Sequence, residues 1–384
     1  MKDDRLERRR FLQRSALALP FLWVPSTAAQ ERSAGGLIIR QREPENLEFA
    51  FSTLDSYLVP NERFYIRSHF PTPALSPASH RIRVEGAVDA PFEIGFEELR
   101  GMTQRSVTAT LECAGNSRVF LVPQAAGVQW EMGAVGNAEW GGVPLAALLE
   151  RARVKSNAVD VVLEGADEGE LRNDPRPPGV VKYFRSIPLA KARRPEVLLA
   201  HQMNGRALPP SHGFPVRAIV PGYYGMSSVK WLSRIHVTST PFQGYWQTID
   251  YAYWERGSGS PTRQALMDMT LKSLIARPTL REVIKSGTTY RVFGAAWTGD
   301  ADISKVEVSV DGSRTWAEAQ LIDKPSRFAW RRWQFEWRVA GQPGRMTVLS
   351  RATDSNGVVQ PVKHNPDTGS YAIHHSLPIE VEVI

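Results

Sequence analysis

The pattern of predicted secondary structure changes once along this 384-residue chain, close to residue 260. Before that point, β-branched and apolar stretches at 107–111, 160–163, 217–220 and 229–237 mix with an amphipathic helical segment at 144–152. After it, strand-like stretches follow one another, with turn residues between them, at 288–297, 303–310, 328–339, 345–353 and 377–383. The change predicts an α+β fold, with a mixed α/β domain followed by an immunoglobulin-like β-sandwich.

The boundary between the two predicted domains is marked by residues 255–261, which read Glu-Arg-Gly-Ser-Gly-Ser-Pro and suggest a hinge or loop. We therefore expect a first domain over 40–260 and a second over 266–384. Residues 329–338 of the second are rich in Trp and Arg. This composition suits a strand with one buried and one solvated face, or a subunit interface.

The first 29 residues resemble an export signal rather than folded structure. A basic start leads into an apolar run at 16–24 and then into small residues at 26–29. Residues 8–12, Arg-Arg-Arg-Phe-Leu, resemble the twin-arginine address that is read on folded proteins. We expect export to the periplasm, with no membrane anchor after processing; an uncleaved amphipathic anchor is the alternative. Removal of this segment reduces the formal net charge from +7 to about +4, so charge alone does not suggest a nucleic-acid partner.

Cys113 is the single cysteine of the chain. One cysteine excludes an intrachain disulfide framework, Cys-based zinc fingers and Cys-ligated iron–sulfur clusters. It follows a predicted strand and precedes small residues, and Arg118 lies five positions later. A thiolate stabilised in this way could hold a soft metal, whereas composition alone favours a buried structural thiol.

The segment around this cysteine, Leu-Glu-Cys-Ala-Gly-Asn-Ser-Arg at 111–118, resembles the Cys-Ala-Gly-Asn signature of the sulfite oxidase family of molybdopterin oxidoreductases. Further resemblances follow in the family's order at 64–71, 203–205, 212–217, 220–225, 229–232, 311–316 and 351–354. Together they cover roughly residues 40–384. They imply a molybdenum cofactor-binding catalytic domain followed by a dimerisation domain, as in a bacterial exported sulfite dehydrogenase.

The resemblance implies that Cys113 is the molybdenum ligand and that Arg67 and Arg118 bind the anionic substrate. A guanidinium presents a fork of donors that suits an oxyanion. Tyr251 and Trp130 match the aromatic side of the substrate pocket. Tyr245 and Tyr253 are alternatives for the tyrosine, and core packing is the alternative role for Trp130.

The resemblance also implies a set of contacts to the cofactor. Arg217 and Lys230 suit its phosphate, and the remaining matched positions are His69, Asp167 and His212. Asp174 is a rival for the aspartate position.

One departure concerns the C-terminal segment, where many family members supply a pocket arginine. Here the segment has histidines, and we expect His374 to take that place with a charge that depends on pH. A solvated loop containing His364, His374 and His375 is the alternative.

The resulting hypothesis is a sulfite dehydrogenase that oxidises sulfite to sulfate by oxo transfer. No Cys-x-x-Cys-His haem motif is present, so we expect no haem or flavin in this chain and a separate electron acceptor such as cytochrome c. A homodimer, or a complex with a cytochrome subunit, is expected. The alternatives are the sulfane dehydrogenase subunit of a sulfur-oxidation complex and a non-catalytic oxyanion-binding protein of the same fold.

Overall fold

The computed structural model describes residues 30–384 apart from 173 and 258, so the predicted export signal lies outside the described residues. Most of the described elements are strands, and the helices among them are short. The α-helices of the described residues are α2 (Phe96–Gly101), α3 (Leu145–Ala152) and α4 (Leu189–Ala192). None of the described helices is both long and apolar enough to cross a bilayer.

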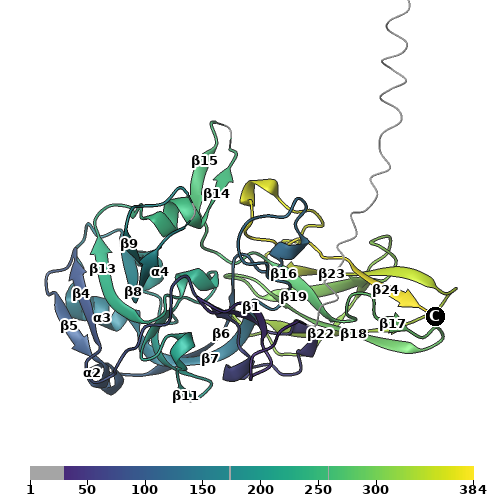
Figure 1. Cartoon of the computed structure of the whole chain (residues 1–384), viewed down its shortest axis with the longest axis horizontal. Coiled ribbons are helices and arrows are strands. Elements are labelled where there is room, and N and C mark those ends of the chain that lie inside the picture. The colour runs from purple at the N-terminus through teal and green to yellow at the C-terminus, as the bar shows by residue number, and fades with distance from the viewer. Residues whose placement is uncertain (1–29, 173, 258) are drawn as a thin grey trace, which may run out of the picture. The chain divides into compact units, whose positions relative to one another are not determined.

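The first part of the chain is built on β-sheets that flank the cysteine segment (Figure 1). One antiparallel sheet has the order β11–β10–β7–β6, with β12 paired to β10. Its strands are β6 (Arg105–Glu112), β7 (Val135–Pro144), β10 (Leu198–Met203), β11 (Arg206–Ala207) and β12 (Arg217–Ile219). Because β6 is an edge strand of this sheet, its outer backbone groups need partners from elsewhere.

A second, mixed sheet has the order β5–β4–β13–β8–β9, in which β13 and β4 pair in parallel. Its strands are β4 (Arg81–Gly86), β5 (Phe92–Gly95), β8 (Asp160–Glu170), β9 (Val180–Pro188) and β13 (Leu232–Thr238). A small N-terminal sheet adds β1 (Ile38–Gln41), β2 (Asn46–Glu48) and β3 (Ile66–Arg67). The predicted strands at 107–111 and 160–163 and the helix at 144–152 are confirmed; α3 buries Leu145, Leu148 and Leu149.

The second part is a β-sandwich, as the spacing of its strands predicts. One sheet has the order β16–β18–β22–β21, and the other has the order β17–β24–β23–β19–β20. The first consists of β16 (Lys272–Arg277), β18 (Thr289–Trp297), β21 (Gln320–Leu321) and β22 (Arg331–Arg338). The second consists of β17 (Val283–Ile284), β19 (Ile303–Ser309), β20 (Ala317–Glu318), β23 (Gly344–Asp354) and β24 (Ile379–Val383).

The Trp- and Arg-rich segment forms β22, which has two different faces. Trp333 and Trp337 are buried in the sandwich core, while Arg332 pairs with Asp323 at 2.8 Å. The interpretation as a two-faced strand is confirmed.

Residues 255–261 do not form a simple linker. They join β14 (Ala252–Glu255) to β15 (Thr262–Ala265), which pair as an antiparallel hairpin (Figure 1). In this hairpin Trp254 lies opposite Arg263, whose guanidinium carbon lies 5.2 Å from the centroid of the Trp254 ring. The described residues of this segment therefore lie between two paired strands, within one continuous body of residues 31–384.

Two apolar clusters form the core. One lies inside the sandwich and is built from residues between Leu271 and Val383. The other fills the first part of the chain, yet it also includes Trp297, Phe328 and Trp330 from the second part. The second part therefore completes the core that surrounds the cysteine segment, as well as its own.

Candidate active site

Cys113 directly follows edge strand β6 and begins a tight turn. Its N–H donates to Ala134 O at 2.9 Å, and its carbonyl accepts from Asn116 N at 2.8 Å. Ser117 has a positive φ of 78°, which closes the turn before Arg118. The turn holds a largely buried thiol at the wall of a cavity.

Two connected cavities meet at this cysteine. The inner one reaches from Cys113 to Arg217 and Lys230, and the outer one has a volume of about 1150 Å³. Both are lined by Arg67, His69, Cys113 and Tyr251. A ligand that spans both cavities would pass directly over the thiol.

Arg67 and Arg118 bring positive charge to the cysteine end. Arg67 donates to Asn46 Oδ1 at 3.2 Å and to the carbonyl of Ser68. Arg118, which is 4% exposed, donates to Val128 O at 2.8 Å and to Ser370 O at 3.1 Å. No ion pair within 4 Å joins either guanidinium to a described carboxylate, although the carboxyl group of Asp250 is close enough for both charges to lower its pKa.

Gly115 explains how Arg118 approaches the turn so closely. A Cβ built on Gly115 would lie 2.2 Å from the Arg118 guanidinium, well inside van der Waals contact. Any larger residue at position 115 would have to displace the Arg118 guanidinium.

Tyr251 reaches the cysteine end from a distant segment. A π-helical turn, Trp246–Asp250, leads directly into it, and such turns are frequent at functional sites. The Tyr251 hydroxyl lies 2.7 Å from His69 Nε2, and the His69 ring stacks on Tyr183 with centroids 4.6 Å apart. Burial, followed by the charge of Arg67, holds the pKa of His69 well below its usual range, so the ring is neutral near pH 7.

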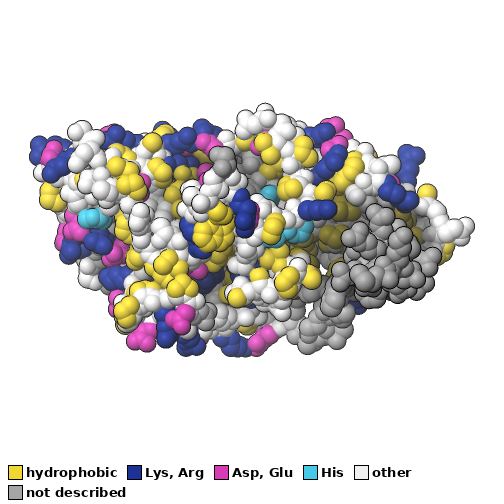
Figure 2. Space-filling view, turned by 90° about the horizontal axis from the view of Figure 1, so that it is seen from above, with side chains coloured by type: hydrophobic (Ala, Val, Ile, Leu, Met, Phe, Trp, Pro, Cys, Tyr) yellow, Lys and Arg dark blue, Asp and Glu magenta, His cyan; other side chains and the backbone are white. Residues whose placement is uncertain are grey.

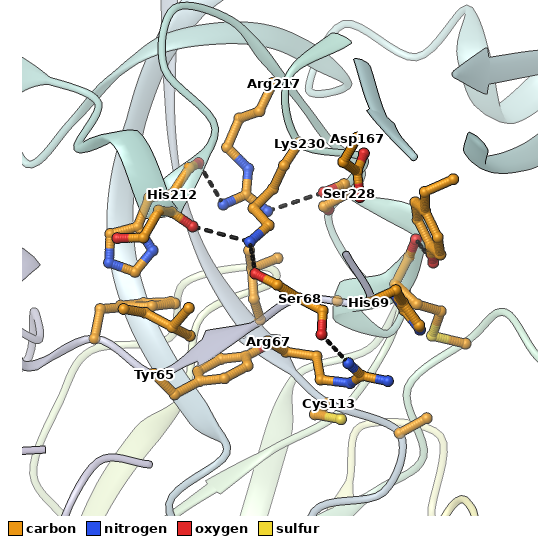
Figure 3. Close-up of a pocket in the computed structure, with 18 of the residues that line it drawn as sticks. Tyr65, Arg67, Ser68, His69, Cys113, Asp167, His212, Arg217, Ser228 and Lys230 are labelled. Atoms are coloured by element: carbon orange, nitrogen blue, oxygen red, sulfur yellow. Dashed lines mark hydrogen bonds between the residues drawn. The ribbon is translucent and has the colours of Figure 1, made fainter. Parts of the chain in front are cut away.

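The opposite end of the inner cavity is cationic (Figure 3). Arg217 donates to His212 O and to Ser228 O, both at 2.9 Å. Lys230 Nζ donates to Ser68 Oγ at 2.8 Å and to Ser211 O at 2.9 Å. Burial lowers the pKa of Arg217 to about 10, and burial together with Arg217 lowers the pKa of Lys230 to about 7.

Several polar groups at this end have no partner among the described residues. Asp167 Oδ1 and Arg217 Nε are buried without a hydrogen bond. Burial raises the pKa of Asp167 to about 6, against the opposing effect of Lys230. Buried polar groups are normally paired, so this end is suited to a ligand that donates a hydrogen bond to Asp167 and carries an acceptor for Arg217.

Most residues expected at the site converge on the two cavities. The inner cavity is lined by His69, Asp167, His212, Arg217, Lys230 and Cys113, and the outer cavity by Arg118. Asp174 instead lies in an exposed loop, 3.3 Å from Arg176, and does not compete with Asp167. Of the alternatives to Tyr251, Tyr245 lines only the outer cavity and Tyr253 lines neither.

Two expected residues lie elsewhere. Trp130 is completely buried and lies outside the lining of both cavities, because its loop turns it into the core. His374 is also absent from the described lining, and its Nδ1 lies 2.6 Å from Ala372 O. His374 thus lies outside the lining of both cavities, and its role as the C-terminal pocket residue stays a prediction.

The C-terminal segment instead contributes Tyr371, which sequence reasoning did not identify. Its hydroxyl donates to Asp250 Oδ1 at 3.1 Å, and Arg118 Cζ lies 5.2 Å from the centroid of its ring. Asp250 also lines the outer cavity. Asp250 could have been found from the sequence, because it directly precedes Tyr251. No feature of the neighbouring residues distinguishes Tyr371 within the C-terminal segment.

The surface of the molecule carries charges of both signs. On the face shown in Figure 2, basic and acidic side chains are interspersed.

Comparison with protein families matches both parts of the chain. Residues 69–246 match the oxidoreductase molybdopterin binding domain, and residues 263–368 match the Mo-co oxidoreductase dimerisation domain. The cavities lie chiefly in the first match, while Tyr371 and the sandwich strands belong to the second part of the chain.

Individual relatives agree with these matches. The chain is 35% identical to chicken sulfite oxidase over 343 residues, covering 85% of this chain and 73% of the relative. It is 32% identical to Arabidopsis thaliana sulfite oxidase over 369 residues, covering 89% of this chain and 93% of the relative. It spans 61% of the length of the rat mitochondrial sulfite oxidase, to which it is 35% identical.

A solved structure is similar over nearly the whole chain. The sulfane dehydrogenase SoxCD from Paracoccus pantotrophus aligns with a TM-score of 0.77 and 26% identity, covering 95% of this chain and 92% of that one. The similarity therefore includes both the cofactor-binding part and the sandwich.

Proposed function

Because this chain belongs to the sulfite oxidase family of molybdenum-cofactor oxidoreductases, we propose that it is an exported sulfite dehydrogenase that oxidises sulfite to sulfate. Its cofactor is the molybdenum cofactor. The observation that carries the proposal is the convergence of the Cys113 thiol, the Arg67 and Arg118 guanidinium groups and the Tyr251 hydroxyl on one pair of connected cavities.

The donor groups of the inner cavity fit this cofactor. Arg217 and Lys230 would hold its phosphate, because both basic side chains line the inner cavity and a bound phosphate would favour the charged form of Lys230. Asp167 and His212 would contact the pterin, where the free Asp167 Oδ1 can accept from ring nitrogens. Cys113 would bind molybdenum as a thiolate, a soft donor that suits this metal.

The cysteine end would bind the substrate. When bound, the molybdenum centre supplies oxygen-atom transfer and accepts two electrons. Arg67 and Arg118 would attract sulfite and fix its oxygens through charge-assisted hydrogen bonds. Tyr251, oriented by neutral His69, would donate a further hydrogen bond from its hydroxyl.

Sulfane sulfur is a second candidate for the substrate. The similarity to SoxCD over almost all of the chain, together with the wide outer cavity of about 1150 Å³, favours a substrate whose sulfur is carried by a larger partner. Sulfane oxidation is therefore the alternative to sulfite oxidation. A non-catalytic oxyanion-binding protein would not need a second pair of basic side chains, Arg217 and Lys230, in addition to Arg67 and Arg118.

The cellular setting forms part of the same proposal. We infer export through the twin-arginine route to the periplasm, from the Arg-Arg-Arg-Phe-Leu sequence at 8–12. The dimerisation domain supports a homodimer or a complex with another subunit. Electrons would pass to a separate acceptor such as cytochrome c.

Metal analysis combined with steady-state assays tests the proposal. We expect one molybdenum per chain and sulfite-dependent reduction of cytochrome c by the mature protein. Molybdenum at that ratio without turnover of sulfite, but with turnover of protein-bound sulfane sulfur, would favour the alternative substrate. Absence of molybdenum from protein matured in a cofactor-producing host would support the non-catalytic alternative.

A further inference from the structure

The turn that carries Cys113 is held from the sandwich side as well as from its own sheet. Thr110 N, on the outer edge of β6, donates to Phe328 O at 2.8 Å, and Trp330 N donates to Thr110 Oγ1 at 2.8 Å. Beyond the cysteine, Ala372 N donates to Ala114 O at 2.8 Å. The second part of the chain thus pairs with the backbone on both sides of the thiol.

A buried ion pair lies behind this turn. Lys272 Nζ, at the start of β16, donates to Glu112 Oε1 at 2.9 Å, and the two side chains are 1% and 2% exposed. The other carboxylate oxygen, Glu112 Oε2, accepts from Trp297 Nε1 of β18 at 2.8 Å. Glu112 is therefore bound through both oxygens by residues of the sandwich.

The same ammonium group also reaches the far side of the turn. Lys272 Nζ donates to Asn116 O at 3.2 Å, and Asn116 Nδ2 donates back to Glu112 Oε1 at 3.1 Å. Asn116 Oδ1 accepts from Ala134 N at 3.1 Å, which ties the turn to the segment preceding β7. One lysine from the sandwich thus joins the residue before Cys113 to the residue three positions after it.

We propose that Lys272 is a positioning residue, which acts through Glu112 and Asn116 to fix the Cys113 thiol in the orientation needed to bind the metal. The inference rests on the proposed role of Cys113. A buried ion pair is seldom the most stable filling for such a space, since an apolar pair of similar volume commonly serves stability as well or better. What the pair provides here is a rigid, directional connection between the sandwich and the turn.

The fact that Cys113 is the single thiol of the chain makes this inference directly testable. In the cofactor-free protein, alkylation with iodoacetamide reports how often the turn opens around Cys113. We expect Lys272→Met to accelerate alkylation about tenfold or more, because it removes the ammonium group that joins Glu112 to Asn116. In the loaded enzyme, we expect an altered molybdenum(V) electron paramagnetic resonance signal and a lower kcat with little change in KM.

Lys191→Met is the matched control. Lys191 is another buried lysine; it donates to Pro221 O at 2.7 Å, and its Nζ lies 4.8 Å from the centroid of the Tyr223 ring. Its loss should lower thermal stability without changing the alkylation rate or the molybdenum(V) signal. If both variants alter alkylation and signal equally, Lys272 only contributes to general stability and the proposal is wrong.

The double variant Glu112→Gln/Lys272→Gln keeps the test decisive if Lys272→Met does not fold. Two amides can retain the hydrogen bond without burying charge, so we expect alkylation within about twofold of the wild-type rate and a near wild-type signal. Fast alkylation in this well-folded double variant would overturn positioning through hydrogen bonds. A protein that binds no molybdenum would instead defeat the role of Cys113, while the alkylation result would still report on the turn.

Discussion

Lys230 provides a quantitative test of the cationic end of the inner cavity. Its ordinary pKa is 10.5, and the fold lowers that pKa to about 7 through burial and through the neighbouring charges of Arg217 and Arg67. Between these values the unfolded chain holds a proton that the folded chain has released. Stability of the cofactor-free protein therefore increases with pH across this window, because unfolding takes up a proton.

The magnitude follows from the two pKa values. One pKa unit corresponds to 1.36 kcal/mol. Integrating the proton difference from pH 7 to pH 9 gives about 2 kcal/mol of added stability from Lys230. Asp167, with a pKa raised to about 6, is mainly ionised in both states over this range and adds little to the slope.

The perturbation is Lys230→Met, measured by urea unfolding of the cofactor-free protein at pH 7 and pH 9. The variant should lose the pH-dependent gain of about 2 kcal/mol that the wild type shows. The lost hydrogen bonds to Ser68 and Ser211 lower its stability at both pH values alike, so they cancel in the comparison. Lys182→Met, at an exposed lysine 3.8 Å from Glu164, serves as the control and should keep the wild-type slope.

Loading with the cofactor should weaken the dependence of wild-type stability on pH. A phosphate beside Lys230 keeps the ammonium charged, so the wild-type slope should flatten, and Lys230→Met should retain less molybdenum after purification. An unchanged pH slope in cofactor-free Lys230→Met would refute the reasoning, because it would mean that Lys230 keeps an ordinary pKa in the fold.

Other predictions concern the cysteine end. Cys113→Ser should abolish sulfite turnover while leaving the circular dichroism spectrum and thermal midpoint close to wild type; near-normal activity would contradict the assigned ligand. Arg67→Ala and Arg118→Ala should each raise KM for sulfite roughly tenfold or more with a smaller fall in kcat; an unchanged KM in both would remove them from the substrate site. Tyr371→Phe removes a hydrogen bond that lowers the pKa of Asp250, so that pKa should rise. Ionised Asp250 would repel sulfite, so KM should rise as Asp250 loses its proton. In Tyr371→Phe this rise should occur at a higher pH than in the wild type. The same dependence of KM on pH in both proteins would exclude an effect of Tyr371 on Asp250.

The sequence predicted those elements whose pattern is local. Strands such as β18 and β23 are recognisable from their own residues, and α3 from the spacing of its leucines. Residues 255–261 were predicted as a hinge or loop, and Gly and Ser suit both a linker and a hairpin loop. The difference is decided by the pairing of Trp254 with Arg263, which composition does not reveal.

Among the site residues, too, those with a local sequence signal were predicted and those placed by long-range contacts were not. His69, Cys113, His212, Arg217 and Lys230 all line the inner cavity, and each lies within one of the matched segments. Tyr371 and Lys272 lie in stretches without such a signal, and they reach the cysteine turn only through contacts between residues more than 100 positions apart. Trp130, which matches the aromatic side of the pocket, lies in the core, which was its alternative role.

The position of β6 explains why the two parts of the chain meet at the cysteine. An edge strand leaves backbone donors and acceptors unpaired, and burying them unpaired would be costly. Here the sandwich supplies the missing partners, with Phe328 O bound to Thr110 N and the Trp330 ring packed into the adjoining core. Covering this edge necessarily brings Lys272 and Trp297 against Glu112, one residue from the thiol. The requirement to satisfy an edge strand thus accounts for how a domain matched as a dimerisation module comes to support the geometry of the candidate active site.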